Sequence, residues 1–304
     1  MRLYSHPACL AHDTGEGHPE RPARLIAVLD ALAARFTELV PHEAPRASRE
    51  SLLRVHVPEL VATVLETQPG ADLHWLDADT ALSSGSAEAA LRAAGAAIAA
   101  TDWVVGGGNR RAFCAVRPPG HHAEPATSMG FCLFDNVAVG AAHAFAVHGV
   151  ERIAIADFDV HHGNGTQAIF ESEPRLLFVD SHQMPLYPGT GAASETGVGN
   201  IANAPYPPLS SGADVRALWR EVLLPKLDAF APQLLFVPAG FDAHRDDPLA
   251  QGLLETGDFA WITTQLVEIA ERHARGRIVS TLEGGYDLSA LAASAVAHVA
   301  ALRG

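Results

Sequence analysis

Two short segments of the chain combine carboxylates with an imidazole in a pattern that can bind a metal ion. Asp157, Asp159 and His161 alternate at the end of an apolar run (RIAIADFDVHH), so on a strand they would share one face. Asp242 ends a second apolar run (LLFVPAGFD). Ionisable groups beside apolar strands cost free energy unless a cation or other partners compensate. Carboxylate and imidazole together suit zinc or another borderline divalent metal.

We therefore predict that Asp159, His161 and Asp242 hold such a metal. Three protein ligands leave one position open for water, which is typical of catalytic rather than structural zinc sites. The alternative is a buried network of hydrogen-bonded Asp and His without a metal, since ion pairs are also common for structural reasons. The addition of Asp242 from a separate strand favours the metal, because buried carboxylates without a counter-charge are rare.

Two further loops carry groups that could act beside a metal. His121 and His122 follow a stiff, proline-containing entry (RPPGHH), and adjacent imidazoles can take separate roles because each responds to its own partner. In isolation such a pair is as readily a solvated surface feature. Tyr286 follows two glycines (LEGGYD), which allow a sharp turn at the sheet edge. Its phenol could donate a hydrogen bond to a polarised carbonyl oxygen, or it could be a stacked rim residue.

The elements that must position these loops are apolar strands alternating with helices. Short apolar runs predict buried strands at 112–116, 152–158, 176–181, 233–240 and 278–282. Helical periodicity appears at 22–35, 86–104, 136–148, 214–230, 258–275 and 288–302. This alternation predicts an α/β fold with a mostly parallel central sheet between two layers of helices. The segment 106–109 predicts a turn rather than a phosphate loop, because a strand follows it.

The loops that carry these reactive side chains each follow a predicted strand. They span residues 117–131, 159–166, 182–191, 242–248 and 283–287. Ligands of open α/β sheets bind beyond the carboxyl ends of the strands, so these loops should converge on one site. No linker, repeat or low-complexity tract divides the chain. We therefore expect residues 1–304 to form a single catalytic domain, a three-layer sandwich.

Composition excludes several classes of protein. The net charge of −14, without a Lys/Arg cluster, argues against a nucleic-acid partner and favours cationic ligands by long-range attraction. No apolar run approaches the roughly 20 residues that span a bilayer, so no membrane partner is expected. The first residues lack a signal-peptide core, and we expect a cytoplasmic protein. Three cysteines without a CxxC pair exclude a disulfide framework and a cysteine-rich zinc module.

Together, five ordered segments resemble the histone deacetylase family, within the arginase–deacetylase fold. They are RPPGHHAEPATSMGFCLFDN (117–136), DFDVHHGNGTQAIF (157–170), DSHQMPLYPGTG (180–191), PAGFDAHRDDPLA (238–250) and LEGGYDL (282–288). HPERP (18–22) resembles the family's first rim loop. HGNGTQ and LEGGYDL are more similar to the class II branch and its bacterial relatives than to class I. The resemblance implies zinc-dependent hydrolysis of an acyl amide, with one zinc ion per chain.

The resemblance also implies a role for each matching residue. Asp159, His161 and Asp242 would bind zinc, whose water would become a hydroxide-like nucleophile. His122, oriented by Asn164, would act as general base and then as general acid, and the Asn in place of the Asp of class I would make it less basic. His121, oriented by Asp157, would stay protonated. Tyr286 would bind the tetrahedral oxyanion together with zinc.

The family's acyl-lysine tunnel and its second cation site map onto further residues. Phe131 (after Gly130) and Tyr187 would form the two aromatic walls, and Cys132 would line the deeper acetate pocket. A structural potassium ion would be held mainly by Asp157 and by backbone oxygens of Asp159, His161 and Ser181, with Asp180 as a further candidate ligand. At Asp180 the family commonly has serine, which leaves the identity of that ion open.

The resemblance to the family leaves two classes of substrate to choose between. Polyamine deacetylases of the family carry an acidic gatekeeper at the rim, whereas this chain has Leu249 after Asp247-Pro248 and no obvious insertion. Leu249 favours acylated lysine of a peptide or protein over an acetylated polyamine, although one rim residue controls specificity only in part. The sequence is compatible with either a monomer or an oligomer.

Two functions of other classes are weaker. A non-catalytic acyl-group sensor on this fold would have lost a ligand or the tyrosine, and neither is replaced. An arginase-like manganese ureohydrolase would need further acidic ligands where this chain has His122 and Tyr286.

Overall fold

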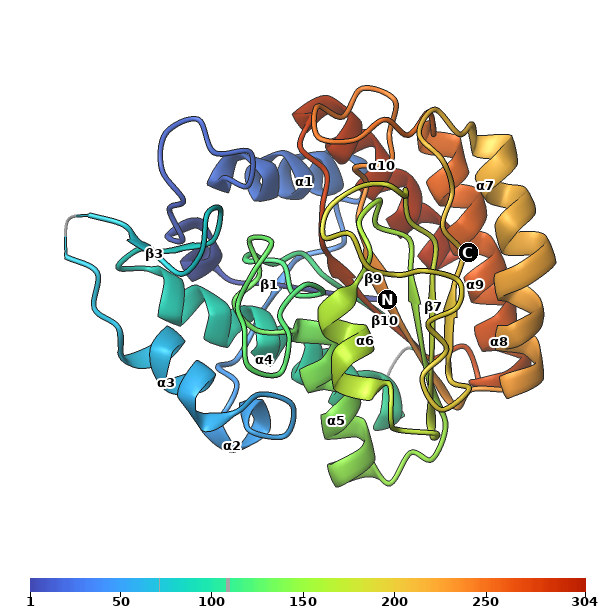
Figure 1. The fold of residues 1–304 in the computed structure, drawn as a ribbon, viewed down its shortest axis with the longest axis horizontal. Helices are drawn as coiled ribbons and strands as arrows, with labels where there is room; N and C mark the ends of the chain where they lie inside the picture. The colour runs from blue at the N-terminus through green and yellow to red at the C-terminus, as the bar shows by residue number, and fades with distance from the viewer. Residues whose placement is uncertain (71, 108–109) are drawn as a thin grey trace.

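A central sheet of eight parallel strands organises the chain. The computed structural model describes residues 1–70, 72–107 and 110–304. The strand order is β2-β1-β5-β10-β9-β6-β7-β8, and every pairing in this sheet is parallel (Figure 1). A two-stranded antiparallel ribbon of β3 (His74–Trp75) and β4 (Ala81–Leu82) forms a separate sheet. The predicted α/β class and parallel sheet are confirmed.

Four inner strands, β6, β7, β9 and β10, are short apolar runs that are buried along their whole length. In β6 and β7 every residue is buried, including the terminal Asp157 and Asp180, which pair with each other in register. Strands of this kind are typical of a parallel sheet covered on both faces. The strands of the large sheet are β1 (Arg2–Ser5), β2 (His42–Glu43), β5 (Arg111–Cys114), β6 (Ile153–Asp157), β7 (Leu176–Asp180), β8 (Ile201–Asn203), β9 (Leu234–Ala239) and β10 (Ile278–Leu282).

Helices cover both faces of the sheet. On one side α4 (Ser86–Val105) packs against α5 (Asn136–His148), and on the other α10 (Leu288–Arg303) packs against α9 (Thr256–His273) and α1 (Pro22–Arg35) (Figure 1). The remaining helices are shorter: η1 (Pro7–Leu10), α2 (Arg49–Leu52), α3 (Pro58–Glu66), α6 (Asn164–Phe170), α7 (Gly212–Leu218), the π-turn η2 (Trp219–Leu223) and α8 (Leu224–Phe230). The three expected layers are present.

Local sequence signals account for several helix starts. Pro22 is the first residue of α1, where its missing N–H costs nothing. The side chain of Asp135 accepts a hydrogen bond from the backbone N–H of Ala138 and caps α5. The side chain of Asp287 caps α10 in the same way, immediately after Tyr286. Two segments of the predicted site are therefore also helix caps, which fixes where the loops end.

Some predicted elements differ from the structure. The predicted helix 214–230 is three segments, α7, η2 and α8, because its middle turn widens to a π-helix. The strands β1, β2 and β8, of which β2 and β8 form the two edges of the sheet, were not predicted, and neither were the helices α2, α3 and α6. β2 and β8 are only two and three residues long, too short for a clear periodicity. Two residues of the predicted turn 106–109, Gly108 and Asn109, lie outside the described residues.

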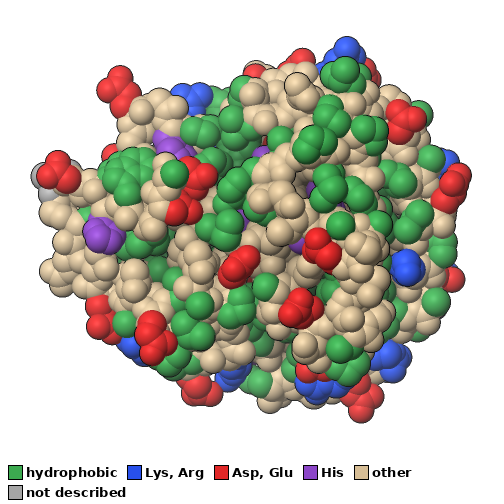
Figure 2. Space-filling view, in the orientation of Figure 1, with side chains coloured by type: hydrophobic (Ala, Val, Ile, Leu, Met, Phe, Trp, Pro, Cys, Tyr) green, Lys and Arg blue, Asp and Glu red, His purple; other side chains and the backbone are tan. Residues whose placement is uncertain are grey.

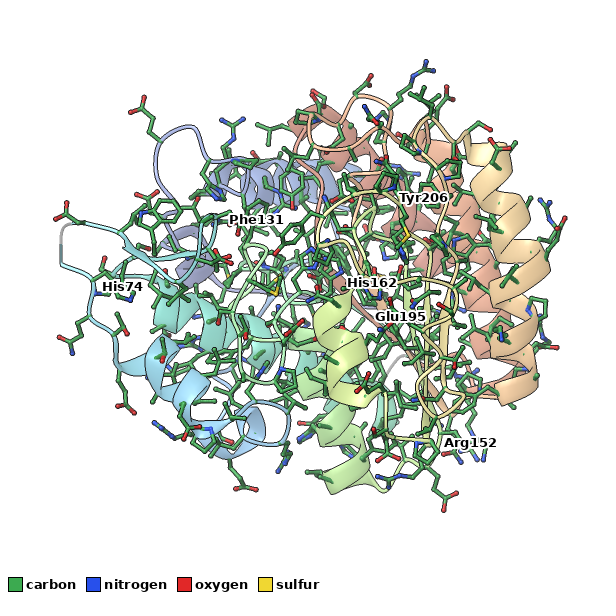
Figure 3. All side chains as sticks on the ribbon, in the orientation of Figure 1. His74, Phe131, Arg152, His162, Glu195 and Tyr206 are labelled. Carbon is green, nitrogen blue, oxygen red and sulfur yellow. The ribbon has the colours of Figure 1, made fainter. Side chains whose placement is uncertain are left out.

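The strands place the chemistry at one edge of the sheet. Figure 3 shows Arg152, just before β6, at the lower edge of the view and His162, just after β6, in its middle. Since all strands of the large sheet are parallel, the loops after β5, β6, β7, β9 and β10 leave from the same edge. The described part of the chain has no helix long and apolar enough to cross a membrane.

Candidate metal centre and active site

The predicted ligands come together beyond the ends of β6 and β9. One ligand atom from each of Asp159, His161 and Asp242 lies within 4.8 Å of the others. His161 Nδ1 is 3.1 Å from Asp159 Oδ1 and 3.1 Å from Asp242 Oδ2. All three residues are buried. Two carboxylates and one imidazole that converge on one point form a donor set suited to zinc.

Backbone groups fix both carboxylates of this cluster. Gly284 N donates to Asp159 Oδ2 at 2.8 Å, and Val160 N donates to Asp242 Oδ1 at 3.0 Å. Gly284 must be glycine, because a Cβ there would stand 2.0 Å from Asp242 Oδ2. The loop after β10 therefore leaves the space between the carboxylates open. These residues fit a small divalent cation.

The charge of the cluster also fits a cation. Burial works against charge on His161, yet hydrogen bonds and the charges of Asp159 and Asp242 raise its pKa to about 10. Burial also raises the pKa of Asp242, and the neighbouring Asp159 raises it further. The two carboxylates thus hold a proton tightly on the imidazole between them. A site that binds a proton so strongly has an excess of negative charge, which a divalent ion would neutralise.

His121 is built to carry a positive charge. Its Nδ1 lies 3.0 Å from Asp157 Oδ2, and its Nε2 lies 3.9 Å from Asp159 Oδ2. Burial opposes the charge, but these two carboxylates raise the pKa of His121 well above its ordinary value. Asp157 is itself held by the backbone N–H of Asp159 at 3.0 Å. The predicted His121–Asp157 pair is therefore present.

His122 lies in the opposite electrostatic environment. Burial, followed by the charges of His121 and His161, lowers its pKa well below the ordinary value. Its Nδ1 is 2.8 Å from Asn164 Oδ1, while Asn164 Nδ2 donates to Glu124 Oε1 at 2.8 Å. Because Asn164 presents an oxygen, His122 must donate from Nδ1. Its Nε2 is then left as the proton acceptor.

Tyr286 is held by two charged neighbours from separate elements. The guanidinium of Arg24 in α1 lies 4.7 Å from the centre of the phenol ring, and its Nε donates to Gly285 O at 2.6 Å. Asp247 Oδ2 accepts a hydrogen bond from Tyr286 N at 2.7 Å. Burial raises the pKa of Tyr286 well above its ordinary value. The phenol therefore keeps its proton and remains a donor.

A narrow pocket of about 210 Å³ leads to this cluster. Its lining residues are Asp79, His122, Gly130, Phe131, His161, Leu186, Tyr187, Leu249 and Tyr286. The Tyr187 ring is perpendicular to that of His122, with centres 5.2 Å apart, and the Phe131 ring lies edge-on to that of Tyr286 at 5.9 Å. The two aromatic side chains thus border a pocket that is also lined by His161, one of the predicted metal ligands.

Other predicted pocket residues take distinct places. Gly130 must be glycine, since a Cβ there would stand 2.5 Å from the His122 ring. Leu249 is 37% exposed and lies at the rim, where its N–H donates to Asp247 Oδ1 at 2.9 Å. Cys132 is fully buried and is not among the pocket-lining residues. Burial raises the pKa of Cys132 well above its ordinary value, so it is a thiol and not a nucleophile.

The residues predicted to hold a potassium ion lie behind the cluster at the ends of β6 and β7. Asp180 Oδ1 is 2.8 Å from His182 Nδ1, and Asp180 Oδ2 accepts from Gly163 N at 2.9 Å. The hydroxyl of Ser181 accepts a hydrogen bond from Trp219 Nε1 at 2.9 Å. The Asp180 carboxylate is therefore already satisfied by partners within the chain. This explains why a carboxylate is stable at the buried position where serine was expected.

Sequence reasoning missed one buried carboxylate next to the active histidines. Glu283 Oε2 accepts from Gly120 N at 2.6 Å and from His121 N at 3.3 Å. It therefore joins the loop after β10 to the loop after β5. Burial raises the pKa of Glu283. An acidic residue directly after the apolar strand 278–282 is the signal that would have found it.

A second missed feature anchors the first rim loop. Glu20 forms a bidentate ion pair with Arg117, with distances of 2.5 and 2.6 Å, and binds Arg24 Nη1 at 3.0 Å. All three side chains are fully buried. The charge of Arg117 outweighs burial and lowers the pKa of Glu20 to about 2. Through Arg24 this pair connects the segment HPERP to the Tyr286 loop.

Comparisons with known proteins agree with this site. Residues 18–302 match the family described as the histone deacetylase domain. The chain is 42% identical over 286 residues to a histone deacetylase-like amidohydrolase of Pseudomonas aeruginosa, which covers 92% of this chain and 74% of the relative. It is 38% identical over 312 residues to the polyamine deacetylase HDAC10 of Homo sapiens, which covers 97% of this chain and 46% of that protein.

A solved structure is similar over the whole chain. The crystal structure of the HDA15 HD domain superposes with a TM-score of 0.93 at 35% sequence identity, covering 100% of this chain and 91% of that one. The parallel eight-stranded sheet between helices is accordingly the arginase–deacetylase fold. Family match, relatives and fold agree, and the chain belongs to the histone deacetylase family of hydrolases.

Proposed function

We propose that this protein is a zinc-dependent deacylase that removes acetyl or related acyl groups from the side-chain amine of lysine in peptides or proteins. One observation carries the proposal. A narrow pocket with two aromatic walls contains a neutral imidazole, a protonated phenol and a predicted metal ligand, namely His122, Tyr286 and His161. These are the groups that hydrolysis of an amide at the end of a thin aliphatic stem requires.

Asp159, His161 and Asp242 would hold the zinc ion. When bound, zinc acts as a Lewis acid toward a carbonyl oxygen and lowers the pKa of a bound water toward neutrality. The backbone N–H groups of Val160 and Gly284 keep both carboxylates in place for this purpose. Asp157 would not be a zinc ligand, because its carboxylate is engaged by His121 and by the N–H of Asp159.

His122 would move the proton that hydrolysis requires. Its Nδ1–H is committed to Asn164, so Nε2 can accept a proton from the attacking water. The same proton would then pass from Nε2 to the leaving amine, as general acid–base catalysis requires. The low pKa of His122 keeps Nε2 free at neutral pH, and protonation of the ring makes it a strong acid.

His121 and Tyr286 would stabilise negative charge as it develops. His121 remains protonated beside Asp157, which places a fixed positive charge behind the reacting carbonyl. The Tyr286 phenol keeps its proton and would donate a hydrogen bond to the oxygen that becomes negative. Phe131 and Tyr187 would hold the aliphatic stem of the substrate between them and exclude water.

An acetylated polyamine is the second candidate substrate, and one observation favours it. Asp79 lines the pocket, and its carboxylate together with the net charge of −14 would attract a cationic chain. Figure 2 shows acidic side chains over the middle of one face and Lys and Arg mainly toward its edge. Against this stands Leu249 at the rim, where polyamine recognition would need an acidic group.

The test is a panel of acetyl-lysine peptides, longer acyl-lysine peptides and acetylated spermidine, each assayed with and without a chelator. We expect acyl-lysine peptides to be hydrolysed with the highest kcat/KM, and the chelator to stop all reactions. Leu249→Glu should shift the preference toward the acetylated polyamine. Hydrolysis of polyamines alone by the wild type would select the second candidate, and activity unaffected by the chelator would refute zinc chemistry.

Two further expectations belong to the same proposal. Residues 1–304 would act as one catalytic domain, which the continuous hydrophobic core from Leu3 to Leu302 supports. A potassium ion would be held by backbone oxygens around Asp157 and Ser181. The internal partners of Asp180 make it a support for that site rather than an added ligand. A cytoplasmic location remains a prediction.

A further inference from the structure

A second cluster of metal-ligating side chains lies outside the active site. Asp102 Oδ1 is 2.7 Å from His143 Nε2 and also 2.7 Å from His148 Nε2. The two imidazole rings are nearly perpendicular, at 74°, with centres 5.4 Å apart. Among the described residues, only this trio and the active-site trio bring three such ligand atoms within 4.8 Å of one another. Two imidazoles and one carboxylate are a donor set for zinc and related metals.

This cluster is at the other edge of the sheet. Asp102 is in the last turn of α4, and His148 is the last residue of α5, shortly before β6 begins at Ile153. The active site lies beyond the opposite end of β6, after Asp157. In Figure 1, the end of α5 that leads into β6 lies at the lower edge of the view. The cluster therefore shares no residue with the active site.

The placement favours a cation for a reason independent of the three side chains. α4 and α5 pack against each other, and both end close to the cluster, at Val105 and His148. The carbonyl ends of two helices thus face the same point, and each carries a partial negative charge. The net charge of −14 adds a long-range attraction for cations. Asp102 is 52% exposed, so an ion can reach it from solvent.

The geometry needs only a small adjustment. Ligands at about 2.0–2.2 Å from zinc in a tetrahedral arrangement are roughly 3.4 Å apart, compared with the 2.7 Å between Asp102 Oδ1 and each Nε2. An exposed carboxylate can withdraw by rotation. Both Nε2 atoms already converge on the same oxygen, Asp102 Oδ1. An ion would replace the protons that lie between these two Nε2 atoms and the carboxylate of Asp102.

Arg54 brings a positive charge against this cluster. Its Nη1 is 3.3 Å from His143 Nδ1, on the side of the ring away from Asp102, and its Nη2 donates to Glu50 Oε1 at 3.0 Å. Arg54 can donate to His143 Nδ1 only while that nitrogen has no proton. Coordination through Nε2 requires the proton on Nδ1, so Arg54 must turn away, toward Glu50. Arg54 therefore opposes metal binding.

We propose that Asp102, His143 and His148 form a second site for zinc or a related divalent transition metal, which links the ends of α4 and α5. Arg54 weakens the affinity of this site. The site is independent of the catalytic chemistry. Metal binding there should change the stability of the α4–α5 pair rather than the turnover.

The test is the zinc stoichiometry of the full-length protein, measured by elemental analysis and by competition with a chromophoric chelator. Wild type should bind two zinc ions per chain. His148→Ala and His143→Gln should each bind the second ion at least tenfold more weakly, with unchanged deacylase activity. Arg54→Ala should bind it more tightly than wild type. Cobalt added after the first site is filled with zinc should give a visible spectrum that His148→Ala lacks.

His273 offers a matched control. Its Nε2 lies 2.8 Å from Asp228 Oδ1, which Arg272 also contacts, so it has the ion pair without a second imidazole. His273→Ala should leave both zinc ions bound. Asp242→Ala should retain the second ion, so failure of the proposed catalytic site would be seen separately. A single zinc per wild-type chain that Asp242→Ala loses, or a second ion that persists in folded His148→Ala, would overturn the proposal.

Discussion

The protein contains two clusters of Asp and His that look alike as sets of side chains but differ in what surrounds them. Asp159, His161 and Asp242 are buried, and backbone N–H groups hold both carboxylates. Asp102, His143 and His148 lie at the ends of two helices. The carboxylate of this trio, that of Asp102, is half exposed, and its partners are the two imidazoles. The first cluster is preorganised for an ion, and the second must rearrange to accept one.

This difference shows what makes a cluster catalytic. Around the buried cluster, His121 and His122 are adjacent in sequence yet have pKa values shifted in opposite directions. The carboxylates of Asp159 and Asp157 outweigh burial and raise the pKa of His121, whereas burial and the charges of His121 and His161 lower the pKa of His122. A pair of groups whose pKa values are driven apart supplies both an acid and a base. Asp102, His143 and His148 do not line the pocket that leads to the buried cluster. The role proposed for the helix-end cluster is therefore to bind an ion without taking part in the reaction.

The largest effect should come from removing the equivalent carboxylate of each cluster. Asp242→Ala should abolish deacylation and release the catalytic zinc, because one ligand is lost and Val160 N–H loses its acceptor. Asp102→Ala should leave kcat within twofold of wild type. Steady-state kinetics together with zinc content measure both. Normal activity of Asp242→Ala, or inactivity of a folded Asp102→Ala, would invert the assignment of the two clusters.

The second largest effect is expected from Tyr286→Phe. The phenol should matter most when the oxygen becomes negative, so kcat should fall by about 10²–10³-fold while KM changes little. The neighbouring ring contacts with Phe131 and Arg24 should persist, since only the hydroxyl is removed. Single-turnover and steady-state rates would separate chemistry from release. An unchanged kcat would remove Tyr286 from the oxyanion role.

A moderate effect should follow from Asn164→Asp. A carboxylate at hydrogen-bond distance from His122 Nδ1 favours the charged imidazole, which raises the pKa of His122 from its present low value. Because the neutral form is the base, the acidic limb of the kcat/KM profile should move up by about one pH unit. The pH profile of the wild type is the reference. A limb that does not move would mean that His122 does not titrate in that range.

The smallest effect is predicted for His148→Ala measured without added metal. The His148–Asp102 contact is then a partly exposed ion pair, which contributes less than about 1 kcal/mol to the free energy of unfolding. With saturating zinc the wild type should gain stability that the variant does not. Chemical denaturation at both conditions measures the difference. Equal zinc effects in the two proteins would show that the helix ends bind no ion.

Much of the fold could be predicted from the chain because the inner strands are continuous apolar runs. The strand 278–282 and the helices 22–35 and 136–148 match the structure residue for residue. The strands β1, β2 and β8 could not be predicted, because their few residues are paired only once the sheet exists. The edges of a sheet depend on tertiary contacts more than on local pattern.

The candidate site could be predicted where residues stand next to strand ends. Asp159, His161, Asp242, His122 and Tyr286 are such residues, and the structure brings them together. Glu283 stands directly after a predicted strand and could have been found by the same signal, but its partners in the loop after β5 are set by packing. The Glu20–Arg117 pair could not be predicted, because its two residues are far apart along the chain. The helix-end cluster could not be predicted either, because Asp102 and His148 belong to two separate helices and lie in no sequence motif.

The most direct test of the catalytic assignment is a zinc titration of metal-stripped protein, with deacylase activity and metal content followed together in the wild type and in His148→Ala. We expect no activity without metal and full activity when the first equivalent of zinc is bound, in both proteins. A second equivalent should bind to the wild type alone and leave its activity unchanged. Full activity of the stripped protein, or activity that returns only with the second equivalent, would contradict the assignment of Asp159, His161 and Asp242 as the catalytic metal centre.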